Sequence, residues 1–169
     1  MSIVVEDDYL DDDYFNSLIG EFTKSTTPYY LGDGVSYEKD GYIQFVHTIY
    51  GLGEVASNFF ELLEPFFTKI KVSKMLFCKI NFLQRTEKVI EHGWHIDVND
   101  IAEDSKEYAK TNILYLNTNN GYTLFKNGIK VPSKANRSVI FPNYFEHSGS
   151  TNTCEAPYRL ALVTNYFSI

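Results

Sequence analysis

The chain has 169 residues, 44% of them hydrophobic, and a formal net charge of −7. This length suits a single domain with one core and is short for two. The acidic balance argues against nucleic acid as a partner, because nucleic-acid binding draws most of its affinity from clustered Lys and Arg.

The start of the chain predicts a soluble protein. The segment Met1-Ser2-Ile3-Val4-Val5 runs directly into acidic residues, without a basic start or a long apolar stretch, so we expect neither a signal peptide nor a membrane span. The acidic run from Glu6 to Asp13 is expected to be a solvated surface feature, with docking of a basic partner as the less favoured alternative. Cys78 and Cys154 lack the close spacing of a metal knuckle or a disulfide framework, which favours a reduced, cytoplasmic setting.

Helical patterns dominate the first part of the chain. Residues 12–24 place apolar side chains at helical spacing behind a group of acids that can cap the start, and predict an amphipathic helix. Residues 25–41 are rich in Ser, Thr, Pro and Gly and predict loop and turn with at most one short strand, and 42–50 then look extended. Helical spacing returns over 54–71, where Pro65 must end, kink or restart the helix because proline lacks the N–H donor.

The remainder of the chain consists of short strand-like runs divided by turn residues. Helices followed by many short strands predict an α+β, mainly β chain in which the helices buttress a sandwich or barrel. We expect one domain over 1–169, with a helical preface over about 1–74 and a β core over about 75–169. The polar stretches 84–91 and 99–110 are expected either to gate a site or to be ordinary surface connections. The predicted strands are 75–83, 93–98, 111–117, 122–125, 137–141 and 158–167.

The triplet His95-Ile96-Asp97 is the clearest candidate for a metal site. Residues two apart on a strand project from the same face, so this pattern aims an imidazole and a carboxylate at one point. His147, from a distant strand, would complete the two-His, one-carboxylate ligand set of non-haem Fe(II) oxygenases. Of the other imidazoles, we expect His47 to be structural and treat His92 as a less favoured alternative to His95.

Arg159 lies inside the apolar run Tyr158-Arg159-Leu160-Ala161-Leu162-Val163. An unpaired buried charge is costly, so this guanidinium requires an anion, and its geometry suits a carboxylate held through two parallel hydrogen bonds. The anion is either an internal Asp or Glu, or a bound dicarboxylate whose other end chelates the metal.

Taken together, these residues give the chain a resemblance to the Fe(II)- and 2-oxoglutarate-dependent dioxygenases, and within them to the prolyl-hydroxylase-like branch. The resemblance covers roughly residues 75–167. Besides the triplet, His147 and Arg159, residues 111–117 are similar to the strand of that branch that carries a Tyr-Leu-Asn triplet, and 119–125 resemble its following Gly-containing turn and strand. The N-terminal helix resembles the helical preface of these enzymes.

The resemblance implies a double-stranded β-helix, a jelly-roll or cupin-like barrel, buttressed by N-terminal helices. Fe(II) would be held by His95, Asp97 and His147.

The resemblance also implies the residues that hold the co-substrate. Arg159 would pair with the distal carboxylate of 2-oxoglutarate, and Tyr115 would donate its hydroxyl to the same group, unless it is simply a core aromatic. Asn81 keeps its place in the Asn-x-Tyr motif of many relatives and is assigned to the cofactor, but Leu83 replaces the tyrosine of that motif.

The implied reaction is hydroxylation with O2 as co-substrate. Asp97 favours it, because related halogenases lack the carboxylate ligand. The expected substrate is an amino-acid side chain, most of all proline in a peptide or protein, with a free amino acid or another metabolite left open. Two other functions remain: a non-catalytic β-barrel binding module for a carboxylate ligand, and a zinc hydrolase using the same triad. The sequence does not define the substrate or the oligomeric state.

Overall fold

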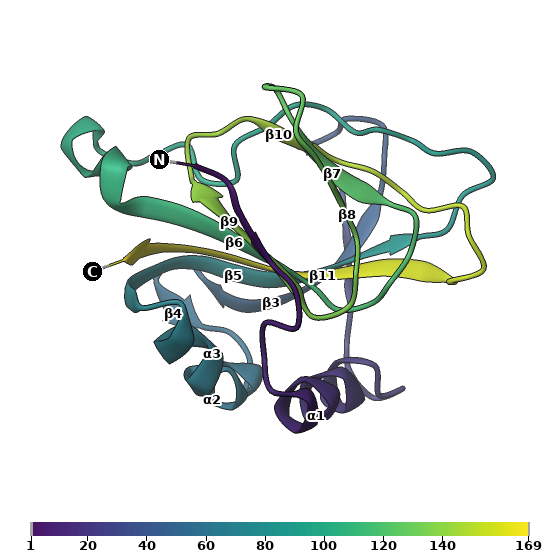
Figure 1. Cartoon of the computed structure of the whole chain (residues 1–169), viewed down its shortest axis with the longest axis horizontal. Helices are drawn as coiled ribbons and strands as arrows, with labels where there is room; N and C mark the ends of the chain where they lie inside the picture. Colours follow the sequence, from purple (N-terminus) through teal and green to yellow (C-terminus); the bar gives the residue numbers. More distant parts are fainter. Residues whose placement is uncertain (1, 169) are drawn as a thin grey trace.

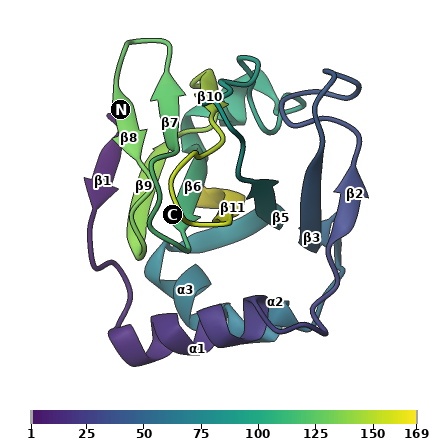
Figure 2. The same ribbon diagram turned by 90° about the vertical axis from the view of Figure 1, so that its right-hand side faces the viewer.

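Two antiparallel sheets face one another in the computed structural model, which describes residues 2–168. The large sheet has the order β1-β9-β6-β11-β5-β3-β2, with β4 paired to β3, and the small sheet has the order β10-β7-β8. The three α-helices lie below the large sheet and the small sheet lies above it (Figures 1 and 2). The strands are β1 (Val4–Glu6), β2 (Tyr30–Gly32), β3 (Gln44–Gly51), β4 (Glu54–Val55), β5 (Val72–Gln84), β6 (Ala109–Tyr115), β7 (Tyr122–Phe125), β8 (Lys130–Pro132), β9 (Arg137–Pro142), β10 (His147–Gly149) and β11 (Tyr158–Ser168).

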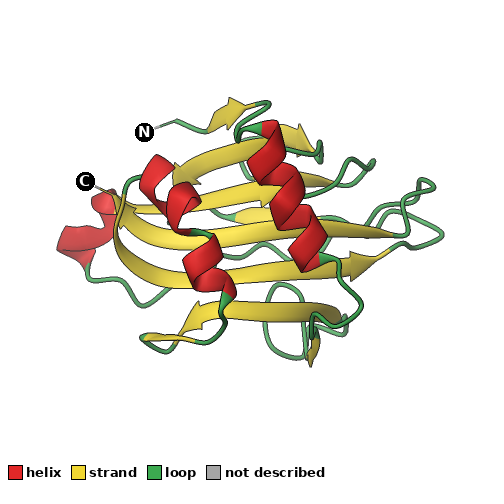
Figure 3. Cartoon of the chain, turned by 90° about the horizontal axis from the view of Figure 1, so that it is seen from below, coloured by secondary structure: helices red, strands yellow, loops and turns green. Residues whose placement is uncertain are grey.

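The helices cross the outer face of the large sheet, as Figure 3 shows from below. Helix α1 (Asp12–Phe22) starts at Asp11, whose side chain accepts hydrogen bonds from the backbone N–H groups of Asp13 and Tyr14. This is the cap that the acidic residues predict. The helix ends two residues before its predicted end, where both the N–H and the hydroxyl of Thr23 donate to the Ile19 carbonyl.

The helical prediction over 54–71 is wrong at its start. Glu54–Val55 forms β4, because a turn with positive φ at Leu52 and Gly53 folds the chain back onto β3. Two short helices follow, α2 (Phe59–Leu62) and α3 (Glu64–Lys69), and Pro65 lies in the first turn of α3, where its missing N–H has no helical partner to lose. Among the described residues, no helix is both long enough and apolar enough to cross a bilayer.

Strand β11 lies at the centre of the large sheet and separates two cores. Leu160 and Leu162 pack with the helices, whereas Ala161 and Val163 pack with the small sheet. Arg159 shares the second face by alternation, so its side chain is directed into the space between the two sheets.

Five predicted strands are confirmed to within a few residues, but the strand over 93–98 is wrong. This segment forms only one isolated bridge, in which His95 and His147 exchange two backbone hydrogen bonds of 3.0 Å. Alternation of side chains predicts an extended chain, but a strand also needs a partner along its whole length. The segment expected as a helical preface also contributes β1 to β4 to the large sheet.

Strand β1 is held by part of the acidic run. The two carboxylate oxygens of Asp7 accept hydrogen bonds from Nε and Nη2 of Arg137, at 2.6 and 3.0 Å, and from Nζ of Lys134 at 3.0 Å. The acidic run is therefore only partly a solvated feature, because Asp7 forms ion pairs with Arg137, the first residue of β9, and with Lys134 just before it.

Asp7→Asn tests this contribution. Arg137 and Lys134 lower the pKa of Asp7 to about 2 from its usual 3.8, so the carboxylate stabilises the fold above pH 3.8 and loses this effect as the pH falls to about 2. Because the side chain is 38% exposed, we expect a loss of only about 0.5–1 kcal/mol in the free energy of unfolding at neutral pH. Urea unfolding across this pH range should show the difference from wild type disappearing at the acidic end. A difference that does not change with pH would contradict the assignment.

Candidate metal centre

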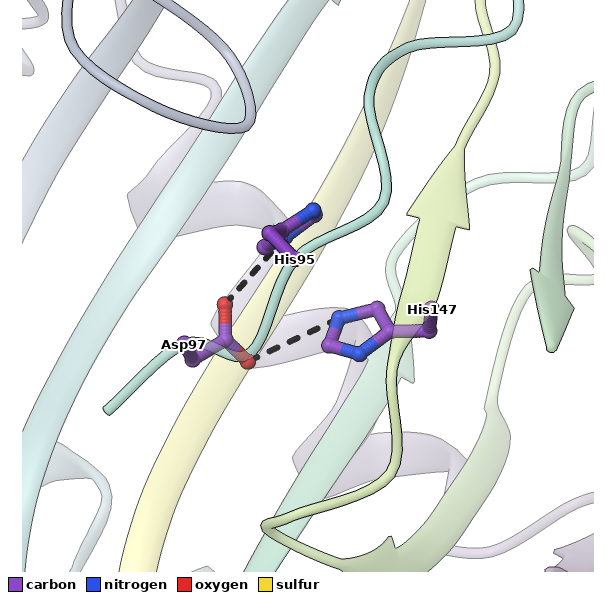
Figure 4. A group of neighbouring side chains, drawn as sticks. All are labelled: His95, Asp97 and His147. Carbon is purple, nitrogen blue, oxygen red and sulfur yellow. Dashed lines mark ion pairs between the residues drawn. The ribbon is translucent and has the colours of Figure 1, made fainter. Parts of the chain in front are cut away.

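Three side chains from two distant segments of the chain converge between the sheets. One ligand atom from each of His95, Asp97 and His147 can be chosen so that all lie within 4.8 Å of one another. Nε2 of His95 is 3.6 Å from Oδ1 of Asp97, and Nε2 of His147 is 3.7 Å from Oδ2 (Figure 4). These distances exceed those of hydrogen bonds and leave room for an ion between the three groups.

The backbone fixes the orientation of both imidazoles. Nδ1 of His95 lies 3.1 Å from the Gly93 carbonyl, and Nδ1 of His147 lies 3.1 Å from the Phe145 carbonyl. We assign the proton to Nδ1 in both rings, because a carbonyl can only accept. The Nε2 lone pairs then face the carboxylate, which is the arrangement of metal-binding histidines.

The electrostatics of the triad also fit a cation. Burial alone would raise the pKa of Asp97, but the positive charge of protonated imidazoles outweighs it and holds that pKa far below its usual value, and a bound metal ion would take the place of those protons. Burial lowers the pKa of His147, whereas the carboxylate raises the pKa of His95 against the effect of burial. Oδ2 of Asp97 is buried without a hydrogen-bond partner. A divalent metal would supply the missing partner, so the donor set fits the ion that the sequence predicts.

Arg159 lines the same pocket as the triad and is only 6% exposed. Its Nε donates to Oγ of Ser133 at 2.9 Å, and its Nη2 donates to Oγ1 of Thr123 at 3.2 Å. Within residues 2–168, no Asp or Glu forms an ion pair with it. The internal salt bridge considered from the sequence is therefore not found in the described chain, and the buried cation faces the pocket without an anion.

Tyr115 belongs to the same hydrogen-bond network as Arg159. Its hydroxyl donates to Oγ1 of Thr123 at 2.8 Å and to the Val131 carbonyl at 3.3 Å. Thr123 thus accepts from both Tyr115 and Arg159 and retains its own hydroxyl hydrogen for an acceptor in the pocket. Thr123, which the sequence analysis did not select, is one of two hydroxyls bonded to the guanidinium, and it is the one that lines the pocket. Its position two residues from Phe125, on the inward face of a short strand, was the available signal.

Two amides complete the lining between the triad and Arg159. Asn81, on β5 opposite Ala161, lines the pocket and its Oδ1 is buried without a partner. Gln44, which sequence reasoning missed, lines the pocket with an equally unpartnered Oε1. Buried polar atoms without partners are rare in folded proteins, and their concentration here indicates a site that receives a polar ligand.

The remaining imidazoles are outside the triad. His47 bonds the Pro28 carbonyl and the Ser57 hydroxyl, both at 2.7 Å, which is consistent with the structural role expected for it. His92 is not part of the converging group, so the triad contains His95 and not the alternative.

No protein-family model and no curated protein matches the sequence. Solved structures do match. A prolyl-4-hydroxylase of Pseudomonas putida aligns with 99% of this chain and 92% of its own, with a TM-score of 0.62 and 13% identity. The epimerase SnoN from nogalamycin biosynthesis, described as non-haem and α-ketoglutarate dependent, aligns with 98% of this chain and 78% of its own (TM-score 0.69, 13% identity). A Trichoplax adhaerens prolyl hydroxylase, solved with a peptide fragment of hypoxia inducible factor, aligns with 98% and 84% (TM-score 0.64, 12% identity).

These likenesses define the fold. It is the double-stranded β-helix of the Fe(II)- and 2-oxoglutarate-dependent oxygenases, buttressed by helices, as the sequence predicts. The resemblance to this group of proteins is thereby confirmed at the level of the fold. At such low identity the neighbours carry no residue-level assignment to this chain.

Removal of a triad side chain should abolish tight binding of a divalent metal. We expect Asp97→Ala and His147→Ala to weaken Co(II) or Fe(II) binding at least about 100-fold, because even the outer partners of metal ligands contribute 10- to 100-fold. Anaerobic titration followed by metal analysis measures this, with His47→Gln as the control that should bind metal like wild type. If both triad variants bind the metal as tightly as wild type, the triad is not the metal site.

Gly121 is required by the close approach of the turn before β7 to Arg159. A Cβ at this position would lie 2.8 Å from Cδ of Arg159 and 3.0 Å from the Thr151 carbonyl. Gly121→Ala should therefore destabilise the fold by about 1–3 kcal/mol through overpacking. Gly20→Ala is the matched control, because a Cβ at this position on α1 meets nothing within 4 Å. Urea unfolding should show the control stabilised by about 0.5–1 kcal/mol, since alanine favours a helix interior. Equal effects at the two glycines would refute the crowding argument.

Proposed function

We propose that this chain is an Fe(II)- and 2-oxoglutarate-dependent oxygenase that hydroxylates an amino-acid side chain. The observation that carries the proposal is the buried Arg159, which has no acidic partner in the described chain and lies in one pocket with the triad. A ligand with a carboxylate at one end and metal-binding oxygens at the other satisfies both groups at once, and 2-oxoglutarate has this structure.

The residues of the pocket would have distinct roles in binding the metal and the co-substrate. His95, Asp97 and His147 would hold Fe(II) through two Nε2 atoms and one carboxylate, which leaves coordination positions open. Bound iron supplies the activation of O2 in this chemistry. Arg159 would bind the distal carboxylate of the co-substrate, assisted by the Thr123 hydroxyl, and Tyr115 would orient that hydroxyl by donating to it. In the overall reaction, 2-oxoglutarate, O2 and a C–H bond give succinate, CO2 and a C–OH group.

The substrate we propose is a residue in a peptide or protein, with proline as the leading candidate. The support is the presence of prolyl hydroxylases among the structural neighbours, one of them in complex with a peptide. Other neighbours are an epimerase and a carbocyclase, so the fold supports several reactions and does not by itself select one. The single-domain organisation and an intracellular location, favoured by two unpaired cysteines, remain part of the proposal.

The two alternative functions explain less of the site. A zinc hydrolase with the same triad would use the metal but give Arg159 no role. A metal-free binding module would use Arg159 but leave the unpartnered Oδ2 of Asp97 unexplained.

The test is formation of a visible charge-transfer band on anaerobic addition of Fe(II) and 2-oxoglutarate. We expect the band in wild type, and a loss of about 30-fold or more in 2-oxoglutarate affinity for Arg159→Leu, because truncation removes one partner of a buried charge pair. Fe(II) affinity of that variant should remain unchanged, which separates the two ends of the pocket. In aerobic assays, peptides or a host lysate should gain one oxygen by mass spectrometry with succinate released in step, an outcome that a zinc hydrolase does not give. If folded wild type shows neither the band nor a thermal shift with 2-oxoglutarate, the proposal is wrong.

A further inference from the structure

A second pocket adjoins the metal centre on the side of Leu83, which lines both. It is a cavity of about 220 Å³, large enough for a side chain with part of its backbone. Its walls are mainly apolar, formed by Ile43, Phe45, Leu83 and Ile90, with the Tyr42 ring beside them. None of the described residues that line it is Asp, Glu, Lys or Arg.

His92 is the one buried side chain of this pocket with polar atoms left to bond. It is only 6% exposed, and neither ring nitrogen has a hydrogen-bond partner among the described residues. The hydroxyls of Thr86 and Thr151, which also line the pocket, are already bonded to each other and to nearby backbone groups. Two unpartnered buried nitrogens on one ring are unfavourable for folding, so the imidazole is placed to serve a ligand.

The backbone around His92 holds it at a fixed position relative to the triad. Its N–H donates to the Gly149 carbonyl at 2.9 Å, and its carbonyl accepts from Oγ of Ser148 at 2.7 Å. Both partners belong to β10, the strand that also carries His147. The ring itself packs only edge-on against Tyr42, with centroids 5.0 Å apart, and Tyr42 is 41% exposed. The partly exposed Tyr42 and the buried His92 thus line the same cavity.

We propose that this second pocket is the substrate subsite and that His92 hydrogen-bonds an uncharged amide of a peptide substrate. Burial lowers the pKa of His92, and Arg159 and His95 act in the same direction against Asp40. The ring is thus neutral and offers one donor and one acceptor, which matches the carbonyl and N–H of an amide. A free amino acid would bring two charges into a pocket without a charged side chain, at a large desolvation cost. The inference rests on the proposed function and specifies its substrate as a residue within a peptide.

The experiment uses the full chain with Fe(II) and 2-oxoglutarate under anaerobic conditions. The probes are the N-acetyl N-methylamides of the amino acids, proline first, and the corresponding free amino acids. Binding is measured by perturbation of the charge-transfer band and by NMR. The variants are His92→Leu, which removes both nitrogens, His92→Gln, which keeps a donor and an acceptor, and His47→Leu as a control at a buried histidine that is fully bonded.

We expect at least one blocked amide to bind wild type more tightly than its free amino acid. His92→Leu should weaken that amide about tenfold, the equivalent of one hydrogen bond, His92→Gln should restore most of the affinity, and His47→Leu should leave it unchanged. The thermal midpoint should fall for His47→Leu and not for His92→Leu, because only His47 loses side-chain hydrogen bonds. A merely structural His92 would instead lower the midpoint of His92→Leu as well and leave the amide affinity unchanged.

Three outcomes overturn the inference: no amide binds, free amino acids bind better, or His92→Leu binds the amides like wild type. If wild type with Fe(II) and 2-oxoglutarate shows no charge-transfer band, the proposed function is wrong instead. In that case, NMR titration of the metal-free chain with the amides tests separately whether the second pocket binds them.

Discussion

The backbone bridge between His95 and His147 is the constraint on which the site depends. Two reciprocal 3.0 Å hydrogen bonds fasten an irregular segment to the short strand β10 at the triad, and the backbone bond from His92 to Gly149 and the bridge between Glu91 and Ser150 hold the residues just before it. Because the bridge pairs the two ligand-bearing backbones directly, it brings the imidazole rings to a centroid distance of 4.5 Å. Asp97 follows two residues later and completes the group. Main-chain pairing thus brings the two histidines together, and their rings meet once each side chain adopts a preferred rotamer.

The pocket between the sheets is unbalanced in charge without its ligands. It holds a guanidinium bonded only to neutral groups at one end, and a buried carboxylate with one free oxygen at the other. Desolvation of both ions opposes folding, whereas a metal ion and a dicarboxylate would supply the missing partners. Ligands that bind the folded state alone stabilise it by mass action, so occupancy of this site and stability of the fold should be coupled.

The features of the site that were predictable from the sequence are those in which a residue type conflicts with its surroundings. Arg159 in an apolar strand and the His-x-Asp triplet stand out because a charge or metal ligand has no ordinary reason to be there. Thr123 and Gln44 did not stand out, since small polar residues are common on strands and their importance comes from partners far away in sequence. The wrong strand at 93–98 has the same origin: alternation is local, whereas pairing along a strand is decided by the rest of the fold.

Leu83 shows how one position divides the two pockets and limits what each can recognise. It pairs with Arg159 across β5 and β11 and contributes to both linings. A leucine offers no hydrogen bond to either side. In the function that we propose, the polar contacts would come from Thr123 beside the guanidinium and from His92 in the neighbouring pocket. These donors, and not the shared fold, would then decide which substrate the protein accepts.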